Sequence, residues 1–405
     1  MKSKKYAAAF LSAMLAVSLF LTGCDTYDNF LAEFFEKSEQ KETTVRIGVF
    51  EPLTGPDADE AEEEVRGIEL AHELFPEVLG FPVELVYADN QSDVQAAVQA
   101  AQSLADQDVS VVLGSYKSVL TLAGSDIFAQ AKIPAIGITC ANPIITQTSD
   151  YYFRVCYVDA FQGNSVAKYV LEHLNFTSAV ALQKRDDDFA GAMIEQFTGK
   201  MTRTTGDPDA VTILEYPENT EDFTPYFEAI RATSASAIFF PSEAEQANEV
   251  LYQASLGAYD FQWIGIEDWA RLPEVNLDPL RDSQVYLNGV AYITGFDDTA
   301  AGLTEMTETF LRAYREKYGE EEKPTQATAL GFDAYLLAIR AIEDAGTYTQ
   351  GTMIAGKISS VFEMPGATGS ITLNAQGDPI KEVVIERFFK DQPRPVFTSV
   401  PVWGQ

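Results

Sequence analysis

Apolar and polar positions follow two alternating patterns along the chain from Val45 onward. Short runs rich in Val and Ile are typical of buried strands, and longer segments with apolar residues three or four positions apart are typical of amphipathic helices. Helical segments separate the first four runs, which are Val45–Phe50, Val83–Ala88, Val109–Gly114 and Ile133–Ile138. This series of strand–helix units predicts a parallel sheet with helices on both faces.

The alternation restarts after the run Tyr152–Tyr157 and predicts a second sheet of the same kind. Two long helical segments, Leu303–Tyr318 and Thr325–Ala345, then follow without strands of their own, so we expect them to cover the first sheet. The fold class is therefore α/β, with two doubly wound lobes. The strands of the second sheet are expected at Ala179–Lys184, Val211–Tyr216, Ala237–Pro241, Phe261–Ile266 and Gln284–Thr294.

Two further alternating segments lie near the C-terminus, at Gly369–Asn374 and Glu382–Lys390. Gly377, Asp378 and Pro379 lie between them. Turn residues between two alternating runs are typical of a β-hairpin. We therefore expect these two segments to pair with each other.

The first residues have the pattern of a lipoprotein signal. Three lysines precede the apolar run Tyr6–Phe20, which is short for a membrane span, and Leu21-Thr22-Gly23-Cys24 follows. This tetrapeptide resembles a bacterial lipobox, which implies removal of residues 1–23 and attachment of lipid to Cys24; the alternative is an ordinary signal peptide with a chance cysteine. Residues 24–44 are polar and are expected to tether the folded part to the outer side of the membrane.

Composition narrows the function further. The chain has 61 acidic and 28 basic residues, for a net charge of −33, which argues against nucleic-acid binding. No nucleophile elbow, phosphate loop, dinucleotide fingerprint or metal-ligand spacing is found, so we expect neither an enzyme nor a metal or other cofactor. If Cys24 carries lipid, Cys140 and Cys156 remain, and the sequence leaves open whether they form a disulfide.

One stretch is a candidate binding element. The predicted strand ending at Gly114 passes into a predicted helix through Ser115–Ser118. The unpaired N–H groups and positive dipole end of a helix favour negative charge, and a nearby hydroxyl adds a donor. The junction therefore predicts a cradle for a carboxylate, although most strand-to-helix turns bind nothing.

The segment Val45–Gly67, VRIGVFEPLTGPDADEAEEEVRG, resembles the opening of type I periplasmic binding proteins of the branched-chain amino acid group. Further matching segments cover most of the chain up to about Val396. The resemblance implies two lobes joined by three crossover strands, with a ligand cleft between them. It places one lobe at 45–158 plus 295–366 and the other at 159–294 plus 367–400. Matching segments include Tyr87–Gln91, Val112–Ser115, Asn142-Pro143, Phe153–Val155, Ala329–Tyr335 and Thr368–Thr372.

The resemblance assigns candidate ligand contacts in the first lobe. Ser118 matches the serine that binds the ligand's α-carboxylate in family members; the alternative role is to cap the helix. The segment Gly137–Pro143 reads GITCANP where the family commonly reads S-P-x-A-T-N-P. Cys140 thus replaces an alanine that offers backbone groups, and Ala141 replaces a threonine that offers a hydroxyl. One expected bond is lost unless Thr139 supplies it.

The remaining candidates come from other segments of the same resemblance. Glu267 falls on the acid that pairs with the ligand's α-ammonium; a solvated loop acid is the alternative. Phe189 matches an aromatic residue, usually Tyr, that closes over the ligand. Glu60 lies where a relative carries an aromatic residue, although a solvated first helical turn is the simpler interpretation. Phe332 is a further candidate for a cleft wall.

The function implied is capture of a small amino acid and its delivery to the permease and ATPase subunits of an ABC importer. The protein is expected to act as a monomer anchored by lipid. Ala141 and Phe189 keep open a second interpretation, in which the same scaffold senses its ligand or binds amides, urea-like compounds or aromatic compounds.

Overall fold

The computed structural model describes residues 44–275, 283–296, 304–320, 322–380, 383–389 and 392–399. The predicted signal segment 1–23, Cys24 and the tether up to residue 43 lie outside the described residues. Within the described ranges, no helix combines the length and apolar character that crossing a membrane requires.

The first lobe is built on a six-stranded sheet with the order β2-β3-β1-β4-β5-β6. All neighbours are parallel except the short edge strand β2, which runs antiparallel to β3. The predicted parallel sheet is thus confirmed. The strands are β1 (Val45–Glu51), β2 (Glu77–Val78), β3 (Phe81–Asp89), β4 (Val111–Gly114), β5 (Ala135–Gly137) and β6 (Tyr152–Arg154).

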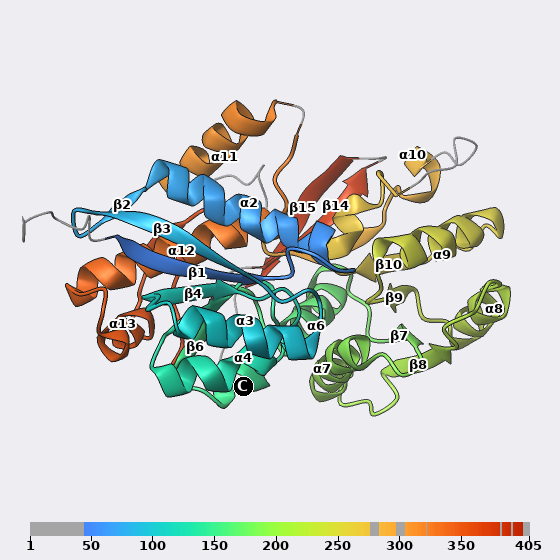
Figure 1. Cartoon of the computed structure of the whole chain (residues 1–405). Helices are drawn as coiled ribbons and strands as arrows, with labels where there is room; N and C mark the ends of the chain where they lie inside the picture. The colour runs from blue at the N-terminus through green and yellow to red at the C-terminus, as the bar shows by residue number, and fades with distance from the viewer. Residues whose placement is uncertain are drawn as a thin grey trace, which may run out of the picture. The chain divides into compact units, whose positions relative to one another are not determined.

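Helices cover both faces of this sheet (Figure 1). Val112 of β4 packs in the core beneath α3 and α4, whereas Val111 and Leu113 pack in the core beneath α2, α11 and α12. Because both faces are buried, the strand has to be continuously apolar. The helices of this lobe are α2 (Ala58–Leu74), α3 (Val94–Ala105), α4 (Ser118–Ala131), α5 (Ile144–Gln147), α11 (Glu305–Tyr318), α12 (Gln326–Ala345) and α13 (Gly351–Ile358).

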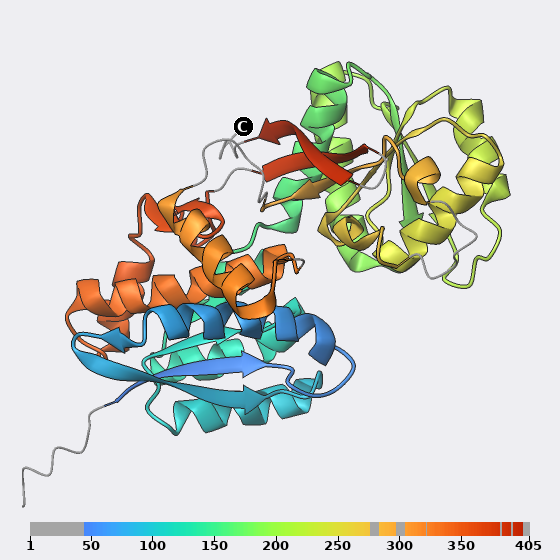
Figure 2. The ribbon, with the colours of Figure 1, turned by 90° about the horizontal axis from the view of Figure 1, so that it is seen from above.

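The late helices α11 and α12 lie beside α2, although they are far from it in the sequence (Figure 2). Two glycines allow α2 and α12 to approach closely. A Cβ atom on Gly67 would lie 1.9 Å from the carbonyl oxygen of Thr328, and one on Gly331 would lie 2.1 Å from that of Glu64. The prediction that this helix pair covers the first sheet is confirmed.

The second lobe has a seven-stranded sheet with the order β15-β14-β11-β10-β9-β7-β8. The strands from β11 to β8 are parallel, and β14 and β15 add an antiparallel edge. The strands are β7 (Ala179–Lys184), β8 (Val211–Tyr216), β9 (Ala237–Phe239), β10 (Gln262–Gly265), β11 (Ala291–Thr294), β14 (Val383–Phe389) and β15 (Gln392–Ser399). The helices are α6 (Asp159–Lys168) with a π-helical turn at Tyr169–His173, α7 (Asp188–Thr205), α8 (Thr224–Thr233), α9 (Ala244–Leu256), a 3₁₀ turn at Glu267–Arg271 and α10 (Ser283–Tyr286).

Three predictions near the C-terminal end are wrong. The run Gln284–Thr294 is not one strand, because α10 ends at Tyr286 and the chain turns through Gly289, whose φ is +94°. The expected hairpin forms only at its turn, where Leu373 pairs with Pro379, and its two strands do not pair with each other. β13 (Gly369–Ile371) pairs with β12 (Met364–Gly366) in the first lobe, whereas β14 pairs with β11 and β15 in the second. Alternation identified these strands but could not identify their partners.

The third correction concerns the lobe boundary at residue 367. Ala367, Ile371 and Leu373 are buried in the core of the first lobe, and Ile380 still bonds to the backbone of Thr372. Residues 367–380 therefore belong to the first lobe. The chain still passes between the lobes three times, after β6, after β11 and after Ile380, as the fold class requires.

Candidate functional site

The turn between β4 and α4 carries Ser118, the predicted carboxylate contact. Ser118 is the first helical residue of α4, and Lys117, with a φ of +64°, precedes it at the N-cap position. The Ser118 side chain does not cap the helix. Its Oγ accepts a hydrogen bond of 3.1 Å from the backbone N–H of Asn142. Ser118 therefore joins this turn to the second candidate loop, 137–143.

A buried acid that the sequence reading missed lies behind the same turn. Glu51 ends β1, is fully buried, and accepts a 2.6 Å bond from the backbone N–H of Tyr116 through Oε2. A Cβ atom on Gly114 would lie 2.4 Å from Glu51 Oε1, so only glycine fits there. One N–H of the predicted anion cradle is thus already engaged by a carboxyl group of the protein. The available signal was the charged end of the otherwise apolar strand VRIGVFE.

A second buried acid reaches the second loop. Glu64 of α2 is fully buried, and its Oε1 accepts a short hydrogen bond from the hydroxyl of Thr139. Burial raises the pKa of Glu64 to about 8, and burial together with the charge of Glu64 raises the pKa of Glu51 well above its usual range. Thr139, expected as a possible ligand donor, is committed to Glu64 in this conformation.

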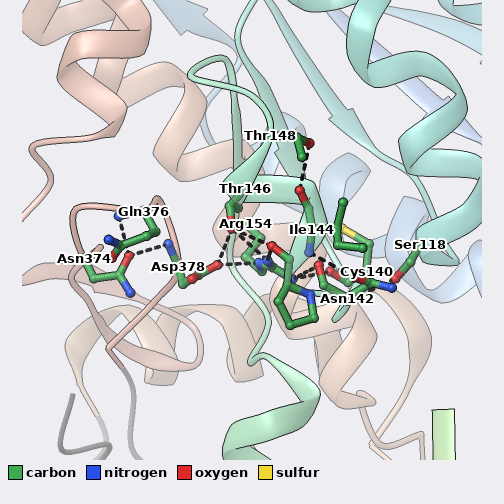
Figure 3. A network of polar contacts seen from close by, with 11 residues as sticks. Ser118, Cys140, Asn142, Ile144, Thr146, Thr148, Arg154, Asn374, Gln376 and Asp378 are labelled. Atoms are coloured by element: carbon green, nitrogen blue, oxygen red, sulfur yellow. Dashed lines mark hydrogen bonds and ion pairs between the residues drawn. The ribbon is translucent and has the colours of Figure 1, made fainter. Parts of the chain in front are cut away.

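The second loop is held mainly through its backbone. Cys140 and Ala141 are buried, with 0% and 9% exposure. The guanidinium of Arg154 lies beside the loop and donates to the carbonyl oxygens of Cys140 and Asn142, each at 2.9 Å (Figure 3). Cys140 and Cys156 are both free thiols, and a hydrogen bond from Cys156 lowers the pKa of Cys140. The two cysteines are thus neighbours, but no disulfide joins them.

The second lobe contributes Glu267, just beyond the carboxyl end of β10. Its Oε2 is shielded from solvent and has no hydrogen-bond partner, although the residue as a whole is only half-buried. Burial raises the pKa of Glu267 to about 8, while interactions with the Thr294 hydroxyl and the Gly295 N–H favour the charged form. A buried carboxyl oxygen without a partner is costly, and a ligand donor would satisfy it.

The acid next to Glu267 has a different environment. Asp268 accepts a 2.6 Å bond from the backbone N–H of Ala244 at the start of α9, and it pairs with Arg271 at 2.8 Å. Its contacts therefore organise the second lobe. Of the two adjacent acids, Glu267 is the one with an unused oxygen.

The remaining candidates are placed in three environments. Phe189 lies in the first turn of α7 and is 46% exposed, so its ring is available for contact. Glu60 is exposed in the first turn of α2, which fits the simpler interpretation of a solvated acid. Phe332 is fully buried and packs on Phe75 and Phe310 in the core, so it lines no accessible surface here.

A metal centre has no support in the part of the chain that the structure describes. No three or more His, Cys, Asp or Glu side chains gather there in a way that could hold a metal ion. The candidate site therefore consists of hydroxyl, backbone, carboxyl and aromatic groups. Such groups can bind a small polar ligand by hydrogen bonds and charge pairing.

Comparisons with known proteins agree with this architecture. The sequence profile of the periplasmic binding protein family matches residues 44–385. An amino acid binding protein of Pseudomonas aeruginosa is 28% identical over 214 residues, which cover 52% of this chain and 56% of that protein. The Leu/Ile/Val-binding protein BraC3 of Rhizobium johnstonii is 23% identical over 82% of this chain and 88% of its own.

Solved structures give the same result for the fold. The leucine binding protein LivK of Thermotoga maritima is 26% identical, with a TM-score of 0.75, over 87% of this chain and 98% of its own. LivJ of Streptococcus pneumoniae, in complex with isoleucine, has a TM-score of 0.75 at 22% identity over 89% of this chain and all of its own. A solute binding protein of R. palustris in complex with benzoate has a TM-score of 0.73 at 15% identity, over 89% of this chain and 97% of its own. The chain therefore belongs to the periplasmic binding proteins, with the type I fold and in the branched-chain amino acid group.

Proposed function

We propose that this chain is the substrate-binding protein of an ABC importer and that it captures a small amino acid between its two lobes. The observation that carries the proposal is the buried Oε2 of Glu267, which has no partner. The ammonium group of an amino acid would supply a charge-assisted hydrogen bond to this atom. Relatives named for leucine, isoleucine and valine binding support an amino acid as the ligand.

The first lobe would bind the carboxylate of the same ligand. Ser118 supplies a hydroxyl, and the N–H groups at the start of α4 and in the segment Cys140–Ala141 supply backbone donors. Phe189 would contact the side chain of the ligand. Each lobe would then hold one half of a charge pair, so ligand binding would favour the closed arrangement of the lobes.

Delivery requires partners beyond the ligand. The closed form would present the amino acid to the permease, with energy from the ATPase subunits. Lipid on Cys24 would hold the protein, as a monomer, at the outer side of the cytoplasmic membrane. Location outside the cytoplasm fits the family and the acidic surface implied by the net charge of −33.

A second candidate ligand class is favoured by one observation. Glu51 already accepts the N–H of Tyr116, and Ala141 carries no hydroxyl, so the first lobe has fewer free donors for a carboxylate than the family pattern implies. A neutral amide, a urea-like compound or an aromatic compound would need fewer such donors. A structural neighbour solved with benzoate supports this range of ligands. A sensor could use the same closure of the two lobes around its ligand.

The test is a calorimetric screen of the protein against the L-amino acids, simple amides, urea and benzoate. The proposal expects saturable binding of one or more small apolar amino acids and loss of that binding in Glu267→Gln. Binding of an amide or benzoate, with no response to any amino acid, would replace the first candidate with the second.

A further inference from the structure

Arg154 is the most heavily bonded side chain near the candidate ligand loops. It ends β6, and its side chain is fully buried. A guanidinium has five N–H donors, and here all five have an acceptor. The acceptors are Asp378 Oδ1 at 2.7 Å, the carbonyls of Cys140 and Asn142 at 2.9 Å, Thr146 Oγ1 at 2.8 Å and, more weakly, the carbonyl of Pro143 at 3.5 Å.

The partner acid, Asp378, belongs to a turn that is also tightly bonded. Its Oδ1 accepts from Arg154 Nε and from the Thr146 hydroxyl at 2.8 Å, and its N–H donates to Asn374 Oδ1 at 2.9 Å. The backbone N–H of Arg154 donates to the carbonyl of Gly377 at 3.1 Å. Figure 3 shows Arg154 between Asp378 on one side and Asn142 and Cys140 on the other, with Thr146 above it.

The two residues also occupy special places along the chain. Arg154 is the last residue of β6 and is followed by Val155 and Cys156 of the first-lobe core before the first passage to the second lobe. Asp378 lies two residues before the third passage. The ion pair thus joins the first-lobe ends of two of the three connections. The same guanidinium holds the loop that carries Cys140 and Ala141. Movement of these connections would shift the loop, because the rigid guanidinium of Arg154 bonds to both.

We propose that Arg154, together with Asp378, is a positioning pair that holds the ligand loop 140–146 in register with two of the interlobe connections. The inference rests on the proposed function in taking this loop as part of the ligand site. Neither side chain touches the ligand in this account. Their effect on affinity arises because the backbone donors of the loop have to be held within a fraction of an ångström of their working positions.

Lysine cannot replace the arginine in this role. It keeps the positive charge, but its three donors radiate from one nitrogen, so it cannot reach all the acceptors that the five N–H groups reach around the edge of the guanidinium plane. Asp378→Asn keeps one acceptor oxygen for Arg154 and Thr146, removes the negative charge and replaces the second oxygen with an NH2 donor. The two variants therefore separate the geometry of the network from its charge.

The experiment compares Arg154→Lys, Asp378→Asn and the parent by hydrogen exchange of the backbone amides and by calorimetric titration with L-leucine and L-isoleucine. Arg340→Lys is the matched control, because Arg340 pairs with Asp344 on the exposed side of α12. We expect faster exchange in residues 140–146 of Arg154→Lys, unchanged exchange in α12, and affinity lowered by roughly 2- to 30-fold. Asp378→Asn should show the same changes to a smaller extent, and the control none.

Two results would overturn the proposal. One is a folded Arg154→Lys protein with parental affinity and parental exchange in residues 140–146. The other is exchange that rises uniformly through α2, α12 and the loop, which would make Arg154 a general stabilising residue only. If Arg154→Lys does not fold, the same two criteria apply to Asp378→Asn. If the parent binds none of the L-amino acids, the proposed function fails, while the exchange measurement still decides whether the pair positions the loop.

Discussion

The candidate walls of the two lobes differ in how completely the groups expected to contact a ligand are satisfied. In the first lobe, Ser118, Thr139 and the backbone of loop 140–146 already have partners within the lobe. The oxygens there without a partner are Glu51 Oε1 and Glu64 Oε2, which belong to the acids behind these loops. In the second lobe, Glu267 keeps a buried oxygen without one. One wall is assembled before the ligand arrives, and the other is left incomplete.

This difference suggests a division of labour between the lobes. Pre-assembled donors lose little conformational freedom on binding, which favours affinity. An unsatisfied buried acid gains most from a cationic group, which favours selectivity for an ammonium. Loss of the Glu267 charge should therefore weaken binding more than changes in the packing or in the finer contacts of the first lobe.

Removing the charge of Glu267 should have the largest effect. Glu267→Gln keeps the shape of the side chain but leaves the bound ammonium without a counter-charge, which should cost about 2–4 kcal/mol of binding free energy, or roughly 30- to 1000-fold in affinity. Calorimetric titration measures this loss of affinity. Asp268→Asn is the matched control, because Asp268 bonds to Ala244 and Arg271 instead. Equal losses in the two variants would count against a special role for Glu267.

The stability of the first lobe depends on the close contact of α2 and α12. Gly331→Ala should lower the free energy of unfolding by about 1–3 kcal/mol or more, because the new Cβ would lie 2.1 Å from the carbonyl oxygen of Glu64. Gly356→Ala in α13, where nothing lies within 4 Å, should instead raise stability by up to about 1 kcal/mol. Denaturant unfolding checks both, and a Gly331→Ala protein as stable as the parent would contradict the packing.

The missing hydroxyl of the first lobe can be restored. Ala141→Thr should raise the affinity for an amino acid by about tenfold, since one hydrogen bond to a charged group contributes about 1.5 kcal/mol or more. Ala141→Val is the control of equal shape without the hydroxyl. If both variants lose affinity alike, the position lacks the space that the family pattern assigns to it.

Stability should also depend on pH through the buried acids. The pKa of Glu64 and of Glu267 is about 8 in the folded protein, against 4.5 ordinarily, so the folded state holds protons that the unfolded chain has released. Their stabilising effect is therefore complete below about pH 4.5 and is lost as the pH rises through 8. The Tm of the ligand-free protein should fall over this range, and less steeply in Glu64→Gln. If the Tm of the parent and of Glu64→Gln depend on pH in the same way, the raised pKa of Glu64 is contradicted.

The aromatic contact should have the smallest effect. Phe189→Ala should lower affinity by about 0.5–1.5 kcal/mol, or roughly 2- to 10-fold, because the ring is 46% exposed and contributes only packing. Phe362→Ala, at an exposed position of the first lobe, is the control. An unchanged affinity in Phe189→Ala would remove this residue from the site.

Periodicity was sufficient to predict most of the fold. β4 could be read from the sequence because a strand buried on both faces has to be apolar at every position, and α12 because its apolar stripe needs a sheet to cover. The partners of β13 and β14 could not be read, since alternation looks the same in either sheet. The same limit explains the misplaced boundary at residue 367.

The site was predictable only where a local pattern marks it. Glu267 directly follows an apolar strand, and Ser118 opens a helix, so both stand out in the sequence. Arg154 and Asp378 pair across 224 positions, so no local sequence pattern could have predicted the pair. The burial of Glu51 and Glu64 was not predicted, because burial of a carboxyl group depends on segments that arrive later in the chain.

The buried carboxyl oxygen of Glu267 is proposed to bind the ammonium group of the ligand. The most direct test is calorimetric titration at pH 7 with leucine, isoleucine and valine, in buffers of different ionisation enthalpy. With a pKa of about 8, Glu267 is mostly protonated before binding and has to ionise when the ammonium arrives. The account predicts release of about one proton per ligand in the parent and none for any residual binding in Glu267→Gln. Binding that releases no proton in the parent, or the same number in the variant, would contradict it.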